Sequence, residues 1–276
     1  MLDETALFFS VSRHGHMVDD LSISDLQILD NNKPPEHILE FVPQSQLPLR
    51  LGLLVDTSES VENRAPFEKQ AARKFLQRMI TVQSDLAFVA GFNSSISVAQ
   101  DFTADPIALT VGVDKLARRG NSTSIFDAIE YGCWKLAAYP DEDRVAKVLI
   151  VLTDGEDNSS HRSLRQSIKF AEDAGVTVYT VSTGVDLDTE TDAARVLKAI
   201  AEGTGGKAIF PETLRDLDRY LSKLSDVIRS RYLIAYKPAD FVPDGKYRTV
   251  QISAAKDGKR MQVRAHGGYY ARFADK

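Results

Sequence analysis

Leu51-Gly-Leu-Leu-Val-Asp-Thr-Ser-Glu-Ser60 is the stretch of sequence that decides the fold. An apolar run ends here directly at a carboxylate, and a continuous apolar run is typical of a strand that is covered on both faces. Val148-Leu-Ile-Val-Leu-Thr-Asp154 repeats the same form about a hundred residues later. Two such strands predict a buried parallel sheet with polar groups at its carboxyl edge.

The segments around these two runs alternate between short apolar strands and amphipathic helices. Further strands are expected at residues 86–90, 96–98, 177–181 and 207–210, and helices at about 65–80, 106–118, 125–138, 162–174, 192–202 and 212–229. Alternation of this kind implies helical crossovers between parallel strands. We therefore predict an α/β fold, with a doubly wound, mostly parallel sheet flanked by helices.

The two ends of the chain show a different pattern, in which short strands are separated by polar turns. These strands are expected at residues 5–12, 26–29, 38–42, 232–236, 247–253 and 261–265. Three strands alone are marginally stable, so we expect the two end segments to pair with each other. The predicted organisation is an N-terminal β segment at 1–46, a central domain at 47–230 and a C-terminal β segment at 231–276, the two β segments forming one small module.

The composition excludes some classes of function. Hydrophobic residues make up 43% and charged residues 26% of the 276 residues, as in ordinary soluble domains. The net charge is −5 and no block of Lys or Arg occurs, so we expect no nucleic-acid binding. Cys133 is the only cysteine, and it lies in a helical pattern that favours a buried core thiol over a nucleophile.

No stretch of the chain has the apolar length that a membrane-spanning helix needs. The first residues, Met1-Leu-Asp-Glu-Thr, lack the basic and apolar regions of a signal peptide. We therefore expect neither a membrane span nor a signal peptide in this chain.

Three polar clusters are expected to meet at one edge of the sheet. Asp56, Ser58 and Ser60 follow the first buried strand, Thr123 precedes a helix, and Asp154 follows the second buried strand. Ligands of doubly wound sheets bind at the carboxyl ends of the strands. These side chains offer only oxygen, which is the donor that Mg²⁺ prefers. For the first three residues, the alternative is a turn that caps the next helix.

This pattern resembles the metal-ion-dependent adhesion site (MIDAS) of von Willebrand factor A domains, in which Asp-x-Ser-x-Ser is followed by a distant Thr and a distant Asp. Asp56, Ser58, Ser60, Thr123 and Asp154 match all of its positions. The resemblance implies that the two serines bind a divalent metal directly, and the other three residues directly or through water. It also implies Mg²⁺, with Mn²⁺ or Ca²⁺ as alternatives, and a vacant position for a Glu or Asp of a partner protein.

The resemblance extends to the von Willebrand A-related proteins of acidobacteria. It rests on residues 20–34, on Thr153-Asp-Gly-Glu-Asp-Asn-Ser-Ser160, on Arg231-Tyr-Leu-Ile-Ala-Tyr-Lys-Pro238 and on Gly268-Tyr-Tyr-Ala271. Those proteins are usually predicted to be exported. The resemblance therefore implies a periplasmic, extracellular or cell-surface setting.

The leading hypothesis is a metal-dependent protein-binding module rather than an enzyme, because no activated nucleophile accompanies the oxygen donors. One alternative is a structural scaffold whose metal only holds loops together, or whose site stays empty. Another is an aspartate-based phosphohydrolase, which would carry a second carboxylate where this chain has Ser58.

Several other polar residues receive simpler interpretations. Glu59 is expected to point away from the metal. Asp157 and Asn158 are expected to belong to an ordinary polar loop, and the alternative is that they support the metal ligands or face the partner. Asp127 is expected to stabilise the N-terminus of its own helix. Gly203-Thr-Gly-Gly-Lys207 predicts a turn that ends a helix rather than a phosphate loop. The five histidines form no zinc-binding pattern, and His14 and His16 are expected in a solvated hairpin turn rather than at a zinc site.

Overall fold

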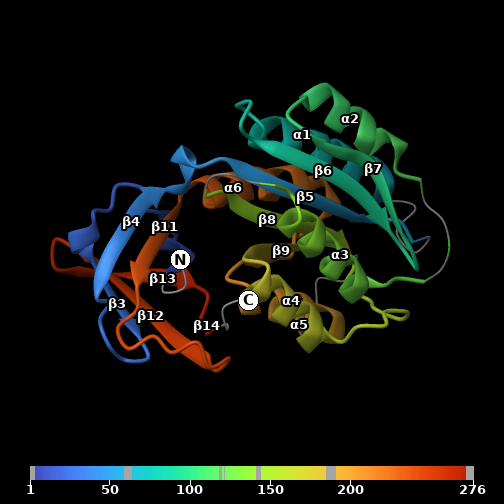
Figure 1. Ribbon diagram of the computed structural model, residues 1–276. Coiled ribbons are helices and arrows are strands. Elements are labelled where there is room, and N and C mark those ends of the chain that lie inside the picture. The colour runs from blue at the N-terminus through green and yellow to red at the C-terminus, as the bar shows by residue number, and fades with distance from the viewer. Residues whose placement is uncertain are drawn as a thin grey trace. The chain divides into compact units, whose positions relative to one another are not determined.

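The computed structural model describes residues 4–58, 64–117, 120, 122–140, 144–184 and 191–271. The chain forms two compact units. One unit comprises Pro48–Ser225, and the other combines Met1–Leu47 with Asp226–Lys276 (Figure 1).

The first unit is built on a six-stranded sheet with the order β10-β9-β8-β5-β6-β7. Its neighbouring strands run parallel, except that β7 is antiparallel to β6. The strands are β5 (Leu49–Asp56), β6 (Leu86–Phe92), β7 (Ile96–Thr103), β8 (Ala146–Thr153), β9 (Val176–Ser182) and β10 (Ala208–Ile209). The α/β fold with a mostly parallel sheet is therefore confirmed.

Helices cover both faces of this sheet, with α1 and α2 on one face and α3, α4 and α5 on the other (Figure 1). The helices are α1 (Ala65–Met79), α2 (Pro106–Lys115), α3 (Ile125–Ala137), α4 (Leu164–Asp173), α5 (Asp192–Gly203) and α6 (Leu217–Arg229). The last predicted helix begins instead as a 3₁₀ turn at Leu214–Asp216. No helix in the described ranges is both long and apolar enough to cross a membrane.

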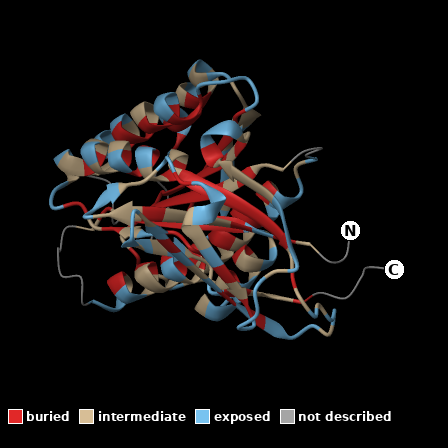
Figure 2. Cartoon of the chain, turned by 90° about the vertical axis from the view of Figure 1, so that its left-hand side faces the viewer, coloured by how far each residue is buried: buried red, intermediate tan, exposed pale blue. Residues whose placement is uncertain are grey.

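The core of this unit explains the two apolar runs. Strands β5 and β8 are buried along almost their whole length, and Figure 2 shows the buried strands between helices whose outer faces are exposed. Gly52 is needed in β5, because a Cβ atom there would come within 2.6 Å of Leu149 and 2.7 Å of Phe88. Cys133 is fully buried in the same core, and burial raises the pKa of its thiol far above the usual range. It is therefore a core thiol, as predicted.

Two of the smaller predictions are confirmed by the turns. Helix α5 ends at Gly203, and Gly205 takes the left-handed conformation, with a φ of 74°, that typically follows a helix end. His14 and Gly15 form the tight turn between β1 (Thr5–Arg13) and β2 (His16–Met17).

The second unit is an antiparallel sheet of eight strands with the order β14-β12-β13-β1-β11-β4, to which β2 and β3 add at β1 and β12. Its remaining strands are β3 (Leu26–Asp30), β4 (His37–Pro43), β11 (Arg231–Lys237), β12 (Tyr247–Lys256), β13 (Lys259–Ala265) and β14 (Gly268–Tyr270). Strand β1 lies between β11 and β13, with Leu7 opposite Ile234 and Val11 opposite Val263.

A buried carboxylate also joins the two ends of the chain within this sheet. The Asp30 side chain is fully buried, and Arg248 Nε donates to its Oδ1 at 2.7 Å. The hydroxyls of Tyr236 and Tyr269 donate to its Oδ2 at 3.0 and 2.8 Å. Burial raises the pKa of Tyr269 to about 12, so this hydroxyl remains a donor at neutral pH. Three side chains of the C-terminal strands thus satisfy one charge from the N-terminal segment.

Asp30→Asn is expected to lower the free energy of unfolding by about 3–5 kcal/mol, because it leaves the buried Arg248 guanidinium without an opposite charge. Urea unfolding followed by circular dichroism measures this loss. The control is Lys33→Ala, which removes an ion pair to Asp240 whose side chains are 60% and 68% exposed. This control should cost less than about 1 kcal/mol. Equal losses of unfolding free energy in the two variants would show that the buried pair stabilises the fold no more than the exposed pair does.

Candidate metal centre

Two carboxylates lie at the same edge of the six-stranded sheet. Asp56 is the last residue of β5, and Asp154 directly follows β8. The two strands are adjacent and parallel, with Val55 opposite Leu152. The strand geometry therefore brings Asp56 and Asp154 to neighbouring positions, as the two apolar runs predicted.

Asp56 is fully buried, and both of its carboxylate oxygens accept hydrogen bonds. The backbone N–H of Ser58 donates to Oδ1 at 2.9 Å, which closes a tight turn over residues 56–58. Thr153 Oγ1 donates to Oδ2 at 2.8 Å. Since Asp56 and Thr153 are the last residues of β5 and β8, this second bond joins the carboxyl ends of the two strands.

The electrostatic state of Asp56 reflects its surroundings. Burial raises the pKa of this carboxyl, and the nearby negative charge of Asp154 raises it further. Hydrogen bonds from Ser58 and Thr153 act in the opposite direction but do not outweigh burial. A cation beside the two carboxylates would relieve both the burial cost and their repulsion.

Asp154 lies beside a positively charged side chain, that of Arg64, which the sequence patterns did not indicate. Arg64 Nη1 lies 3.5 Å from Asp154 Oδ2, and the two side chains are only 13% and 12% exposed. Arg64 directly precedes α1. A single arginine in a polar loop forms no sequence pattern, so only the fold reveals this pair.

The backbone of Thr123 is clamped to the loop that carries Asp154. Thr123 N–H donates to the side-chain oxygen of Asn158 at 2.9 Å. In return, the backbone N–H groups of Asn158 and Ser159 donate to the Thr123 carbonyl at 3.0 and 3.2 Å. Asn158 was expected to be an ordinary loop residue, but it fixes the position of Thr123, which is itself buried.

Asp157 supplies the N-terminal cap of α3 from a different loop. Its Oδ2 accepts from the backbone N–H groups of Ile125 at 2.7 Å and Phe126 at 3.3 Å. The residue in the local cap position, Ser124, makes no side-chain cap bond. A carboxylate at this helix end satisfies unpaired N–H groups and suits the helix dipole. Asp157 is therefore structural, and not merely a loop residue as expected.

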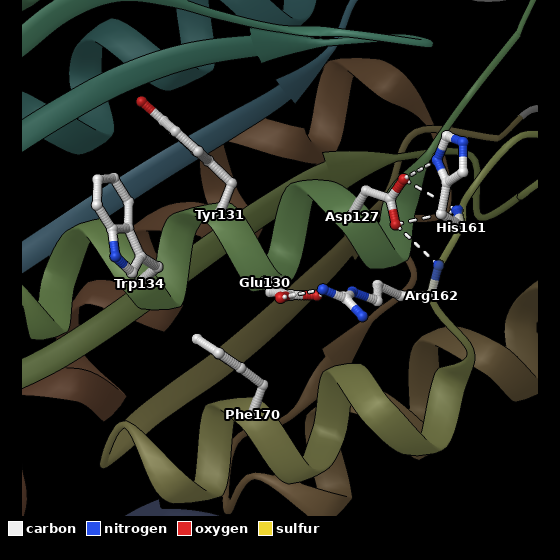
Figure 3. A pocket seen from close by; sticks show the side chains of 7 residues that line it. All are labelled: Asp127, Glu130, Tyr131, Trp134, His161, Arg162 and Phe170. Carbon is white, nitrogen blue, oxygen red and sulfur yellow. Dashed lines mark hydrogen bonds and ion pairs between the residues drawn. The ribbon is translucent and has the colours of Figure 1, made fainter.

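Asp127 forms the third link between α3 and the loop after β8 (Figure 3). It lies in the first turn of α3, as predicted, but its carboxylate accepts from the backbone N–H groups of His161 and Arg162 at 3.0 and 2.9 Å. Burial raises the pKa of Asp127, yet the bonds from His161 and Arg162 outweigh burial and lower it overall. These residues line an open hollow of about 600 Å³ together with Glu130, Tyr131, Trp134 and Phe170.

The structure thus joins Asp56, Ser58 and Asp154 and ties Thr123 to the same loop. Ser60 and Glu59 lie outside the described residues. Within the described ranges, no three His, Cys, Asp or Glu side chains form a metal-binding group. The donor set here is instead two carboxylates with serine and threonine hydroxyls, which suits a hard cation rather than zinc bound by histidine or cysteine.

Comparison with solved structures finds chains with the same fold. A von Willebrand factor type A protein from Catenulispora acidiphila aligns with a TM-score of 0.58 at 14% identity, over 98% of this chain and 74% of that one. Proximal thread matrix protein 1 from the mussel byssus, described with a zinc-occupied MIDAS motif, gives a TM-score of 0.55 at 20% identity, over 72% and 50%. The minor pilin PilB from Streptococcus sanguinis gives 0.53 at 14% identity, over 67% and 62%.

Comparison with curated protein sequences gives no match. The sequence model of the von Willebrand factor type A domain, however, matches residues 51–223. This match covers more than half of the chain and runs from β5 into α6, the elements that build the six-stranded sheet and its helices. The chain therefore belongs to the von Willebrand factor type A domain family.

Proposed function

We propose that this chain is a metal-dependent protein-binding module, which holds one divalent cation at a metal-ion-dependent adhesion site and binds an acidic side chain of a partner protein. The observation that carries the proposal is the pair of carboxylates, Asp56 and Asp154, at the ends of adjacent parallel strands. The proposed metal ligands, bound directly or through water, are Asp56, Ser58, Ser60, Thr123 and Asp154.

The described residues fit a hard divalent cation. Both oxygens of Asp56 accept hydrogen bonds, from Ser58 and Thr153, and a carboxylate oxygen can accept more than one interaction. The donors are all oxygens, as Mg²⁺, Mn²⁺ and Ca²⁺ prefer. We propose Mg²⁺ as the resident ion. When bound, the ion would supply an electrophilic position for a carboxylate of the partner, with the serine and threonine hydroxyls adding no negative charge.

Binding suits this site better than catalysis. The position two residues after Asp56 holds Ser58, which cannot act as the second carboxylate of an aspartate-based phosphohydrolase. The thiol of Cys133 is buried in the core and cannot reach a substrate. We therefore propose a binding role without turnover.

We also propose an architecture and a setting for the module. Residues 1–46 and 231–276 would form one β module attached to the domain at 47–230. A periplasmic, extracellular or cell-surface location is supported by structural neighbours such as the minor pilin.

Titration calorimetry of the chelator-stripped protein with Mg²⁺ and Mn²⁺ is expected to show saturable binding at one site. Asp56→Asn and Asp154→Asn should each abolish it, because either substitution removes half of the charge that attracts the ion. Asp114→Ala is the matched control, since Asp114 pairs with Arg73 at the surface of α2 and should leave binding unchanged.

Three other outcomes would contradict the proposal. Absence of binding in the wild type would favour a scaffold with an empty site. Equal binding in wild type and both Asn variants would place the ion elsewhere. Phosphoester turnover that is lost in Asp56→Asn would favour a phosphohydrolase.

Partner binding is expected to depend on the same ion. Cross-linking of the immobilised protein to extracts of its source cells should identify a partner in Mg²⁺ that is lost with chelator and with Asp56→Asn, but kept with Asp114→Ala. A partner that stays bound in chelator would instead support a structural role of the domain.

Asn158→Ala is expected to weaken metal binding by about 10–100-fold, because it removes the side-chain bond to the Thr123 backbone without changing a proposed ligand. The same titration measures this effect. Gln166→Ala is a suitable control, since its side chain accepts from Ser163 in the cap of α4 and makes no bond to Thr123 in the part of the chain that the structure describes. If Asn158→Ala binds the metal like the wild type, the Asn158 side chain is not needed to position Thr123 for the metal.

A further inference from the structure

Arg64 occupies a position that helix α1 does not favour. It is the N-cap residue of α1, and it makes no side-chain cap bond. Ser, Thr, Asp and Asn are preferred at this position, because their oxygens accept from the first N–H groups of the helix. The N-terminus of a helix also carries partial positive charge, which repels a guanidinium. Arg64 itself has helical backbone angles, with φ −96° and ψ −19°, so its side chain gives α1 no cap, and the contact that the structure shows for it is the ion pair with Asp154.

The Arg64 guanidinium is nevertheless held inside the protein, beside Asp154. Its side chain is 13% exposed, and its Nη1 is buried without a hydrogen-bond partner among the described residues. The separation of 3.5 Å between Nη1 and Asp154 Oδ2 is an ion-pair distance and too long for a good hydrogen bond. Burying a charged donor without a hydrogen bond costs free energy. An acceptor that approaches Asp154 could accept a hydrogen bond from this group and remove that cost.

We propose that Arg64 is a second anion-recognition group of this site, which makes the binding of the cation and of the partner's carboxylate depend on each other. This inference rests on the proposed metal site. Before the cation binds, the guanidinium neutralises Asp154. After it binds, two positive charges lie close together, and a carboxylate that accepts from Arg64 and from the metal relieves their repulsion.

This arrangement defines the chemistry of the partner group. A carboxylate has two oxygens, one for the cation and one for the Arg64 guanidinium. A neutral amide offers one acceptor and no negative charge, so it does not relieve the repulsion between the cation and Arg64. The site should therefore discriminate Asp and Glu from Asn and Gln more strongly than a metal alone would.

Calorimetric titration with Mn²⁺ tests this role in the full chain, in chloride, in acetate at the same ionic strength, and in chloride with acetamide. For the wild type, acetate should tighten Mn²⁺ binding by about tenfold, within the usual range of coupling between two sites, while acetamide should not. Arg64→Gln should bind Mn²⁺ about tenfold more tightly than the wild type in chloride, because the repelling charge is gone. Acetate should no longer improve its binding.

Arg64→Lys is the matched variant that keeps the charge but loses the planar fork of donors. It should bind Mn²⁺ like the wild type in chloride and respond less to acetate. Weak complexation of free Mn²⁺ by acetate affects all variants equally, so the differences between them report on Arg64.

The inference is overturned if Arg64→Gln binds Mn²⁺ no better than the wild type in chloride, or if acetate has no effect on the wild type. If the wild type binds no Mn²⁺ in any of these solutions, the proposed metal site itself fails and this inference falls with it. If circular dichroism shows that Arg64→Gln is unfolded, the wild type and Arg64→Lys still decide through their response to acetate.

Discussion

The hydrogen bond from Thr153 to the buried carboxylate of Asp56 connects the two central strands at the edge where the proposed site lies. This bond offsets part of the free-energy cost of burying the Asp56 carboxylate. It also fixes the start of the loop that carries Asp154. The parallel pairing of β5 and β8 makes this bond possible, since parallel neighbours end at the same edge. The apolar core beneath therefore determines where the polar chemistry can occur.

Helix α3 extends this arrangement to the third loop. Asp157 caps the helix, Asn158 holds the backbone of Thr123, and Asp127 binds the far end of the same loop. Each bond pairs a carboxylate or amide oxygen with a backbone N–H group, so the position of Thr123 does not depend on its own side chain. These bonds hold the loops together without a ligand, and a preorganised site loses less entropy when a ligand binds.

Sequence patterns predicted the sheet well, because its central strands are apolar along their whole length and its helices have regular amphipathic spacing. They also placed Asp56 and Asp154 at one edge, since each directly follows such a strand. The antiparallel direction of β7 and the 3₁₀ start of the last helix were not predicted, because both depend on packing rather than on a local pattern. The role of Arg64 was not predicted for the same reason, since its partner lies 90 residues away in sequence. For Asn158, a supporting role was only the alternative, because its partner Thr123 lies 35 residues away.

The central claim is that the carboxylates at this edge hold a divalent cation. The most direct measurement is the anomalous difference map of crystals grown with Mn²⁺. We expect one strong peak between Asp56 and Asp154, within coordination distance of at least one of their oxygens or of a water that they bind. An ordered site that shows no such peak at saturating Mn²⁺, or a single peak at another carboxylate cluster, would contradict the claim.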